Sequence, residues 1–440
     1  MAADQFHLAW FLNGYRVHGW SSTWIGANTT QWMLPDFYAE FARSLERACF
    51  DYLILEDSAF VPDAWGDSHD IYLQHALHIP KHDPAVLASI LSQATSRLGI
   101  VPTLSITEYP PYLLARYIST LDHVSRGRAG WNMVTGSSDR AAQNYGHEAQ
   151  PAHDLRYDMA EEFTELVRAL WDSWEPEAMV VDADAGMFVD GSKVHKIDFE
   201  GRFYKSRGPL NTARSPQGQV PIVQAGGSPR GRAYASKHAD CIIATGRSVA
   251  EMKAYRDDVH ARMVANGRKP DECKVLFLVS PVLGETEAEA KDKKARSVAA
   301  AGEHPELYYA NLGFVTNIDF SVYDLDTPVG ELASQLTTNG HQSSLDALVK
   351  GNEHRTLREI AGSGQPGQRV ELIGTPDQVA GQMGELMEET GGDGFLFTLD
   401  TLTRRTVAEI TDGLVPQLQK RGLTRKSYTY DHFRDNLLEF

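Results

Sequence analysis

The 440-residue sequence has few cysteines, no excess of basic residues and no membrane-length apolar stretch at its start. Its three cysteines, Cys49, Cys241 and Cys273, are far apart and form no CxxC pair, so neither a disulfide framework nor a structural zinc site is predicted. Cys49 and Cys241 lie in apolar runs and are predicted to be buried thiols. Acidic residues outnumber basic ones by 59 to 42, a net charge of -17, which argues against binding to nucleic acid. We expect a cytoplasmic protein with no membrane association.

Short apolar runs alternate with helical patterns along most of the chain. Nearly continuous apolar runs are typical of parallel strands buried on both faces. They are residues 7–13, 52–57, 98–106, 128–136, 221–226, 241–246, 274–284 and 394–400. Helical periodicity lies between them, as in residues 35–50 and 110–125. The pattern predicts an α/β protein with a (β/α)8 barrel, formed by residues 1–440 as one domain, with insertions at about 174–219 and 301–368.

Capping side chains before prolines mark several helix starts, at Asp83-Pro84, Ser228-Pro229 and Thr375-Pro376. In a barrel of this kind, the active site is built from the carboxyl ends of the strands and the loops after them. That rule nominates Asn13, Asp57, Thr103, Asn132, Thr135 and Gly226.

The segment QAGGSPRG, residues 224–231, is the most informative local pattern. Gly226 and Gly227 allow the backbone to approach a ligand, and the free N–H groups of the following helix start form an anion site. Ser228 adds a hydroxyl, and Arg230 or Arg232 can add charge. The segment matches neither a Walker loop nor GxGxxG, so it favours a phosphate site of another kind. An ordinary strand-to-helix turn is the alternative.

The other candidates each have a structural alternative. Asp57 ends a strand and either binds a ligand hydroxyl or caps a turn. Thr103 shares the inward face of its strand with Ser105, and Asn132 places an amide in a strand, where the barrel itself could satisfy it. His153 and Tyr157 lie one helical turn apart on one face, and together could clamp a phosphate or a planar ring, or serve packing alone.

The histidine-rich run of residues 69–82 invites a metal-site reading, but its spacing matches no HExxH motif or zinc finger. No GxSxG elbow or catalytic-cysteine signature is present either. We therefore expect no metal, and hydrolase chemistry is not indicated.

Longer blocks carry a family resemblance. LDHVSRGRAGWNMVTG (121–136), AGGSPRG (225–231) and the wider stretch 82–136 resemble the nitrilotriacetate / dibenzothiophene-sulfone monooxygenase family, a branch of the bacterial luciferase-like superfamily. The resemblance runs from about residue 6 to 438.

This resemblance implies the oxygenase half of a two-component system. In such a system an NAD(P)H-dependent flavin reductase supplies FMNH2, which reacts with O2. The resulting flavin (hydro)peroxide oxidises an organosulfur, amine or heteroaromatic compound, often with C–S or C–N cleavage. Motif matching implies that Asp57, Thr103, His153, Tyr157, Gly227 and Ser228 bind FMN and that Asn132 acts at the reactive edge of the flavin. It also implies a homodimer or homotetramer. In this interpretation the flavin carries out the oxidation chemistry. The protein binds and orients the flavin and the substrate, and it excludes water from the site.

Several positions depart from the family pattern, among them Gly136, His18 to Trp24 and the segment 397–406. These regions shape the substrate pocket, so the substrate is left open. Many aromatic residues, Trp20, Trp24, Trp32, Phe60 and Trp65, favour a planar or apolar substrate. Three alternatives remain: an enzyme of the same family that acts on a flavin or another heterocycle, a flavin-binding protein without catalysis, and a deazaflavin-dependent dehydrogenase.

Overall fold

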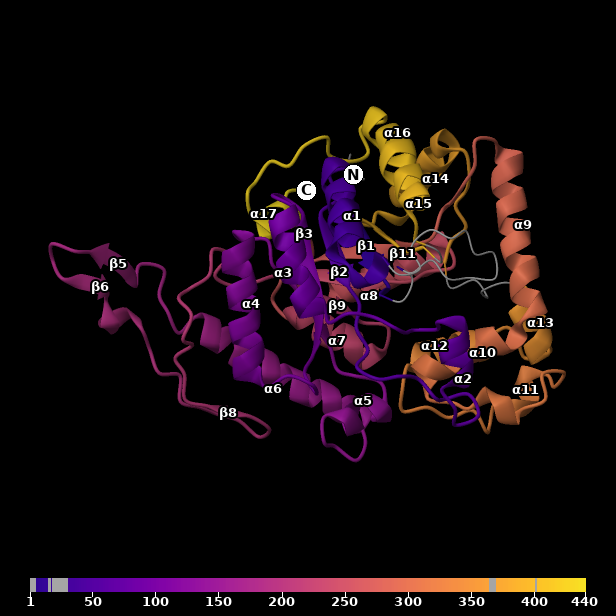
Figure 1. Cartoon of the computed structure of the whole chain (residues 1–440), viewed down its shortest axis with the longest axis horizontal. Coiled ribbons are helices and arrows are strands. Elements are labelled where there is room, and N and C mark those ends of the chain that lie inside the picture. Colours follow the sequence, from indigo (N-terminus) through magenta and orange to yellow (C-terminus); the bar gives the residue numbers. More distant parts are fainter. Residues whose placement is uncertain (1–4, 15–16, 18–30, 364–368, 400–401) are drawn as a thin grey trace.

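Eight parallel strands close into a barrel at the centre of the molecule (Figure 1). The computed structural model describes residues 5–14, 17, 31–363, 369–399 and 402–440. The barrel strands are β1 (His7–Leu12), β2 (Tyr52–Leu55), β3 (Gly99–Ser105), β4 (Trp131–Val134), β9 (Ile222–Ala225), β10 (Cys241–Ala244), β11 (Lys274–Val279) and β14 (Gly394–Phe397). Pairing of β1 with both β2 and β14 closes the ring. Each predicted apolar run contains one of these strands, so the barrel prediction is confirmed.

The strands are apolar on both faces because both faces are buried. Ala9, Tyr52, Val101, Val223 and Leu276 belong to one cluster inside the barrel. The alternate residues belong to a second, larger cluster beneath the surrounding helices. Strands buried in this way lack the polar–apolar alternation of a half-exposed sheet. All three cysteines are buried and free, as predicted for Cys49 and Cys241.

The run 274–284 is not one strand, which corrects the sequence prediction. β11 leaves the barrel after Val279, and Ser280-Pro281 follows. Proline has no N–H to donate to a sheet, so the ladder stops there. The remaining residues form β12 (Val282–Leu283), which pairs outside the barrel with β13 (Ile373–Gly374).

Helices surround the barrel. Those of its first half are α1 (Pro35–Arg47), α2 (Asp70–His75), α3 (Pro84–Ala94), α4 (Pro111–Ser125), α5 (Asp139–Asn144) and α6 (His153–Trp171). Those of its second half are α7 (Pro229–His238), α8 (Val249–Ala265), α14 (Pro376–Thr390), α15 (Arg404–Ala408), the π-helix η6 (Glu409–Leu414), α16 (Val415–Lys420) and α17 (Phe433–Leu437). The three predicted N-caps are confirmed: Asp83, Ser228 and Thr375 each accept a hydrogen bond from a backbone N–H in the first turn.

Two stretches depart from the strand–helix alternation. Residues 174–219 hold two small hairpins, β5 (Met179–Asp182) with β6 (Met187–Val189) and β7 (Phe199–Glu200) with β8 (Lys205–Ser206). The β5–β6 hairpin projects from the body (Figure 1). The second departure begins with α9 (Glu287–Glu303) and continues through α10 (Pro305–Thr316), α11 (Val329–Leu332), α12 (Gln342–Val349) and α13 (Leu357–Gly362). The helices α10 to α13 share an apolar cluster of their own, to which α9 contributes no residue.

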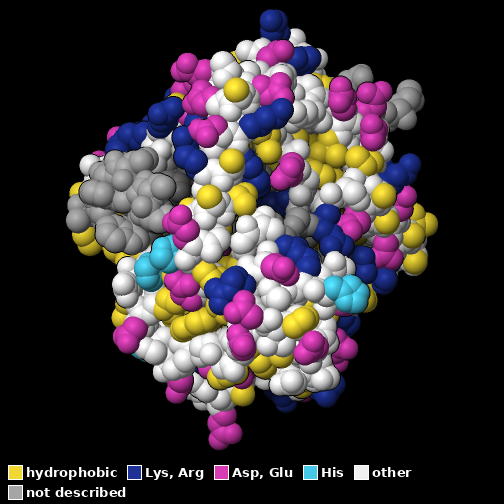
Figure 2. Space-filling model, turned by 90° about the vertical axis from the view of Figure 1, so that its right-hand side faces the viewer, with side chains coloured by type: hydrophobic (Ala, Val, Ile, Leu, Met, Phe, Trp, Pro, Cys, Tyr) yellow, Lys and Arg dark blue, Asp and Glu magenta, His cyan; other side chains and the backbone are white. Residues whose placement is uncertain are grey.

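The face that carries α9 to α13 mixes charges of both signs. Figure 2 shows Lys and Arg side chains interspersed with Asp and Glu side chains on it, so the acidic excess does not form one separate patch on this face. Among the described residues, no helix combines the length and the apolar character needed to cross a membrane.

The C-terminal segment covers the end of the barrel at which the strands begin. Phe433 of α17 packs edge-on against Tyr52 inside the barrel, with ring centroids 5.5 Å apart. Beside it, Asp51 is buried between His7 Nδ1 and Arg425 Nη2, each 2.9 Å from its Oδ1. Burial alone would raise the pKa of Asp51, but the charges of His7 and Arg425 outweigh it and hold the pKa below its usual value. The ion cluster ties β1 and the turn before β2 to the C-terminal segment.

We expect Asp51→Asn to lower the free energy of unfolding by about 3 to 5 kcal/mol, because the buried Arg425 would lose its fully buried carboxylate partner and keep only the longer contact to Glu439, at 3.5 Å. Urea denaturation at pH 7 measures the change. Asp412→Asn is the matched control, since the Asp412–Arg47 pair is exposed and should cost less than about 1 kcal/mol. Equal effects of the two substitutions would contradict the structural role of Asp51.

Candidate active site

Most of the predicted site residues lie on one rim of the barrel. β2, β3, β4 and β9 are consecutive neighbours in the ring. Asp57 follows β2, Thr103 and Asn132 lie in β3 and β4, and Ser228 follows β9. Because parallel strands all end on the same side, these four side chains belong to one continuous arc. The structure therefore brings the sequence candidates together.

Thr103 and Asn132 form a directly bonded pair inside this rim. Their Cα atoms are register partners between β3 and β4, and Asn132 Nδ2 donates to Thr103 Oγ1 at 2.8 Å. Each residue is 4% exposed. Asn132 Oδ1 is buried and has no hydrogen-bond partner among the described residues. The barrel thus satisfies only half of this amide, and an unpaired buried acceptor costs about 1 to 3 kcal/mol.

Asp57 is a half-buried carboxyl group beside a basic residue. Its Oδ1 accepts a hydrogen bond from the backbone N–H of Ser58 at 2.8 Å. Burial raises the pKa of Asp57 to about 6, and the charge of Lys81 only partly opposes it. Lys81 itself is bonded to Glu56 and to the Ser58 hydroxyl. A carboxyl with such a pKa exchanges its proton near neutral pH.

The start of α7 gathers Ser228, His153 and Tyr157. Ser228 Oγ accepts from the N–H of Gly231 at 3.0 Å and lies 3.4 Å from His153 Nε2. The rings of His153 and Tyr157 meet edge-on with centroids 5.2 Å apart, as their spacing on one helix face predicts. A hydroxyl, an imidazole and a helix N-terminus therefore converge, which is the donor set that an anion prefers.

Close approach explains the glycines of this turn. A Cβ atom on Gly231 would lie 2.7 Å from the Tyr157 hydroxyl, so only glycine permits the contact between α6 and α7. A Cβ atom on Gly227 would meet Ser343 Oγ at 3.2 Å. Gly226 is bonded through its carbonyl to the Tyr255 hydroxyl at 2.6 Å.

Arg230 and Arg232 bind acidic side chains of the protein. Arg230 pairs with Asp158 and Glu161, and Arg232 pairs with Asp258. The positive charge expected from them at the helix start is therefore largely neutralised within the protein.

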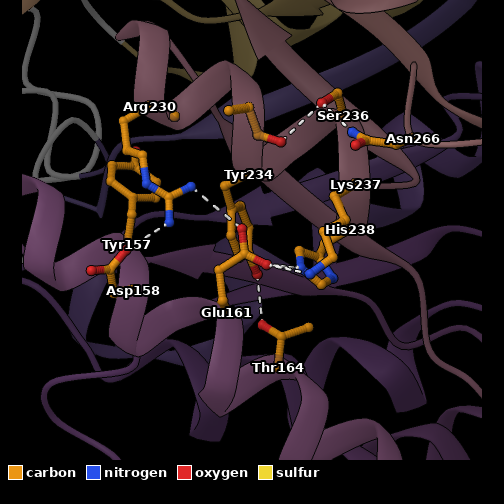
Figure 3. A network of polar contacts seen from close by, with 12 residues as sticks. Tyr157, Asp158, Glu161, Thr164, Arg230, Tyr234, Ser236, Lys237, His238 and Asn266 are labelled. Carbon is orange, nitrogen blue, oxygen red and sulfur yellow. Dashed lines mark hydrogen bonds and ion pairs between the residues drawn. The ribbon is translucent and has the colours of Figure 1, made fainter. Parts of the chain in front are cut away.

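A polar network locks α6 against α7, and Arg230 is part of it (Figure 3). Glu161 of α6 accepts hydrogen bonds from His238 at 2.6 Å and Lys237 at 2.8 Å. Burial opposes ionisation of Glu161, but these hydrogen bonds outweigh it and bring its pKa to about 2. Thr164 and Tyr234 add a buried hydroxyl contact of 2.6 Å between the same helices. The network fixes His153 and Tyr157 relative to Ser228.

Residues between 317 and 343 complete the rim, and sequence reasoning missed them. Arg156 of α6 is 1% exposed and donates to the Asn339 carbonyl at 3.1 Å. Asn317 Nδ2 donates to the Ser137 carbonyl at 2.7 Å. Together with Ser343 beside Gly227, these contacts seat the segment on the strand-end loops. Contacts across more than 100 residues of sequence leave no local signal.

Other nominated residues have separate surroundings. Asn13 donates to Thr398 Oγ1 at 3.1 Å, on the β1–β14 side of the barrel. In the histidine-rich run, His69 contacts the Pro62 carbonyl, and the His78 ring stacks on Phe314 at 3.6 Å. No group of three or more metal-ligating side chains occurs within the described ranges. Trp20 and Trp24 lie outside those ranges.

Comparison with known proteins identifies the family of the chain that carries this rim. The family model described as luciferase-like monooxygenase matches residues 19–394. The chain belongs to the luciferase-like monooxygenase family. The predictions of the family and of an enzyme of the monooxygenase class are thereby confirmed.

Individual members of the luciferase-like family match over nearly the whole chain. Dibenzothiophene-sulfone monooxygenase of Rhodococcus erythropolis (strain XP) is 36% identical, over 98% of this chain and 96% of that protein. Nitrilotriacetate monooxygenase component A of Aminobacter aminovorans is 34% identical, over 91% and 89%. The crystal structure of a riboflavin lyase with modified FMN and riboflavin superposes with a TM-score of 0.88, at 32% identity over 99% and 96%.

Asp57→Asn should stabilise the protein at alkaline pH. The raised pKa means that the folded protein binds the proton of Asp57 more tightly than the unfolded chain does. The stability that this proton binding adds is therefore fully present below pH 3.8 and is lost as the pH rises through about 6. Between pH 5 and pH 8 the free energy of unfolding of the wild type should fall by about 1 kcal/mol relative to the variant. Chemical denaturation at both values tests this, and parallel curves would contradict the raised pKa.

Proposed function

We propose that this chain is the oxygenase component of a two-component monooxygenase, which uses FMNH2 and O2 to oxidise an organosulfur, amine or heteroaromatic compound. The rim carries the proposal: an anion site at one end and an unsatisfied buried amide at the other lie on one arc of neighbouring strands. The family relationship supports the same reading.

The residues fit the phosphate of FMN. Ser228, His153 and the free N–H groups at the start of α7 supply donors, and Gly227 allows close backbone approach. Tyr157 lies against this cluster, and burial raises its pKa, so its hydroxyl stays a donor. With Arg230 and Arg232 engaged elsewhere, the anion would be held mainly by dipoles, hydroxyls and an imidazole.

The residues also fit the ring system. Asn132 Oδ1 is an acceptor that the protein leaves unpaired, and we assign it and Thr103 to the reactive edge of the flavin. Asp57 would accept a hydrogen bond from the cofactor. When bound, reduced flavin supplies the electrons that activate O2. The protein binds and orients the flavin and the substrate, and it excludes water from the site.

A separate reductase is the proposed partner. The relative from Aminobacter aminovorans is named as component A, which implies a second component. We propose that this component is an NAD(P)H-dependent flavin reductase that delivers FMNH2. The homodimer or homotetramer expected from the sequence remains part of the proposal.

Aromatic side chains near the rim support a planar substrate. The ring of Phe314, in α10, stacks with Phe60, with centroids 5.3 Å apart, and with His78, with centroids 3.6 Å apart. Phe60 lies in the loop after β2 that also holds Asp57. This stack, with the sulfone named for one relative, favours an organosulfur or heteroaromatic compound over a small polyacid.

The likeness to the riboflavin lyase favours one alternative. That protein binds modified FMN and riboflavin as substrate, so this chain has a second candidate function, the oxidation of a flavin or another heterocycle.

The deciding experiment supplies purified protein with FMN, NADH and a general flavin reductase under ¹⁸O2. Dibenzothiophene sulfone, nitrilotriacetate and riboflavin serve as probes, and mass spectrometry follows the products. We expect a product with one ¹⁸O atom from a sulfur or nitrogen compound. Consumption of riboflavin alone would favour the alternative, and the absence of label from all three, with no FMN binding, would refute the proposal.

Ser228→Ala should weaken FMN binding by about 1 to 2 kcal/mol, the loss of one hydrogen bond to a charged group. Fluorescence titration measures it, and riboflavin, which lacks the phosphate, should bind both proteins equally. Thr375→Ala is the control, because it removes the same Ser/Thr-Pro helix cap from α14, where Thr375 is bonded to Gln378 in the first turn of its own helix. Unchanged FMN affinity in Ser228→Ala would remove Ser228 from the phosphate site.

Asn132→Ala should retain FMN binding but uncouple the reaction, since the acceptor at the reactive edge is lost. We expect less oxygenated product and more hydrogen peroxide per NADH consumed. Peroxide and product are quantified in the same assay. A normal ratio of product to NADH would show that Asn132 has no such role.

A further inference from the structure

A second cavity lies outside the rim site. It has a volume of about 330 Å³ and lies between the loop after β3 and the loop that joins α5 to α6. Ile106, Tyr109 and Met159 contribute to its apolar walls, and Glu108, Gln150 and Tyr204 are among its polar lining residues. Asp57, Thr103, Asn132, His153, Tyr157 and Ser228 do not line it.

Two buried polar atoms in this lining have no hydrogen-bond partner in the described part of the chain. Gln150 is 6% exposed, and its Nε2 donates to the Ser138 carbonyl at 3.3 Å, which fixes the amide and leaves Oε1 unpaired. The Tyr204 hydroxyl is the second. Burial raises the pKa of Tyr204 to about 12, so it remains a hydroxyl donor. Buried polar atoms in native proteins are nearly always paired, so a ligand is a natural partner for both.

Glu108 brings a carboxyl group to the same cavity. No hydrogen bond or ion pair reaches this carboxyl from the described residues, and burial, with the charge of Asp57, raises its pKa to about 7. The other titratable groups around it are Tyr109, Tyr145 and His147. A partly buried carboxylate without a countercharge, such as that of Glu108, is stabilised by a cation.

We propose that this cavity binds a small organic cation with a flat apolar body, of the arylamidine or arylamine class. The cationic N–H groups would face Glu108 and the Gln150 carbonyl, while the tyrosine rings pack on the body of the ligand. An anion would meet the negative charge of Glu108 and Asp57. A plain hydrocarbon would leave Gln150 Oε1 and the Tyr204 hydroxyl unpaired. The site needs no flavin and is independent of the proposed reaction.

The cavity shares a wall with the rim. Thr107 Oγ1 is 2.8 Å from Ser105 Oγ, at the end of β3. A Cβ atom on Gly136, which follows β4 with φ of +75°, would lie 2.6 Å from Gln150 Nε2 and 2.9 Å from Thr107 Oγ1. The glycine therefore lets the strand-end loop pack directly on the lining of the cavity.

Benzamidine is the probe, with benzamide as its neutral analogue and benzoate as its anionic one. Calorimetric titration of the full chain at pH 8, where Glu108 is ionised, should show benzamidine binding at least about tenfold more tightly than either analogue. Glu108→Gln should weaken benzamidine at least tenfold. Glu148→Gln, which changes an exposed carboxylate in the loop that joins α5 to α6, should bind like the wild type. Ala149→Trp, at an exposed lining position, should abolish binding without altering the core.

Equal affinity for benzamidine and benzamide, or full binding by Glu108→Gln or by Ala149→Trp, would overturn the proposal. Repeating the titration with saturating FMN separates the two sites. Unchanged benzamidine affinity supports the cavity, whereas displacement by FMN would place benzamidine in the rim site and overturn it.

Discussion

Closure of the parallel barrel is the constraint on which the rest of the molecule depends. Each barrel strand has a hydrogen-bonded neighbour on both sides, so the ring leaves no free edge, and all eight strands end on the same rim. The register of β3 with β4 places Thr103 opposite Asn132. A shift of either strand by one residue would turn the polar side chain of that strand out of the barrel, so the polar pair depends on the same register as the apolar core.

The two ends of the barrel differ in how their polar groups are satisfied. At the end where the strands begin, Asp51 is bonded to His7, Arg425 and the backbone of Leu8, and α17 covers the opening. At the rim, Asn132 is only half satisfied. Both carboxylate oxygens of Asp51 are paired, while the buried Arg425 Nε has no hydrogen-bond partner among the described residues. Paired networks contribute stability, whereas unpaired buried groups cost it. The protein is thus tied together at one end and keeps unmet hydrogen-bonding capacity at the other, where a cofactor would bind.

Positioning at the rim relies on helix-to-helix contacts more than on the strands alone. His153 and Tyr157 belong to α6, while Ser228 begins α7, and the ion network around Glu161 holds the two helices together. Arg230 takes part in that network. This explains why a basic residue next to a helix start need not be an anion ligand: its nearest partners are acidic side chains of the neighbouring helix, whose position only packing reveals.

The sequence alone determined the barrel and much of the rim. Runs apolar on both faces, proline-preceded caps and the glycines of residues 224–231 each reflect a local requirement of backbone or burial, and so each strand, each of the three caps and the arc from Asp57 to Ser228 could be predicted. Only the tertiary structure decided the pairing of Arg230 with Asp158 and Glu161, the break of the strand after Val279 into a separate sheet, and the seating of Asn339 and Ser343 on the rim. The cavity at Glu108 belongs with them. These features depend on contacts between distant segments, whose geometry is set by packing, while periodicity and spacing record only what a residue requires of its neighbours in the chain.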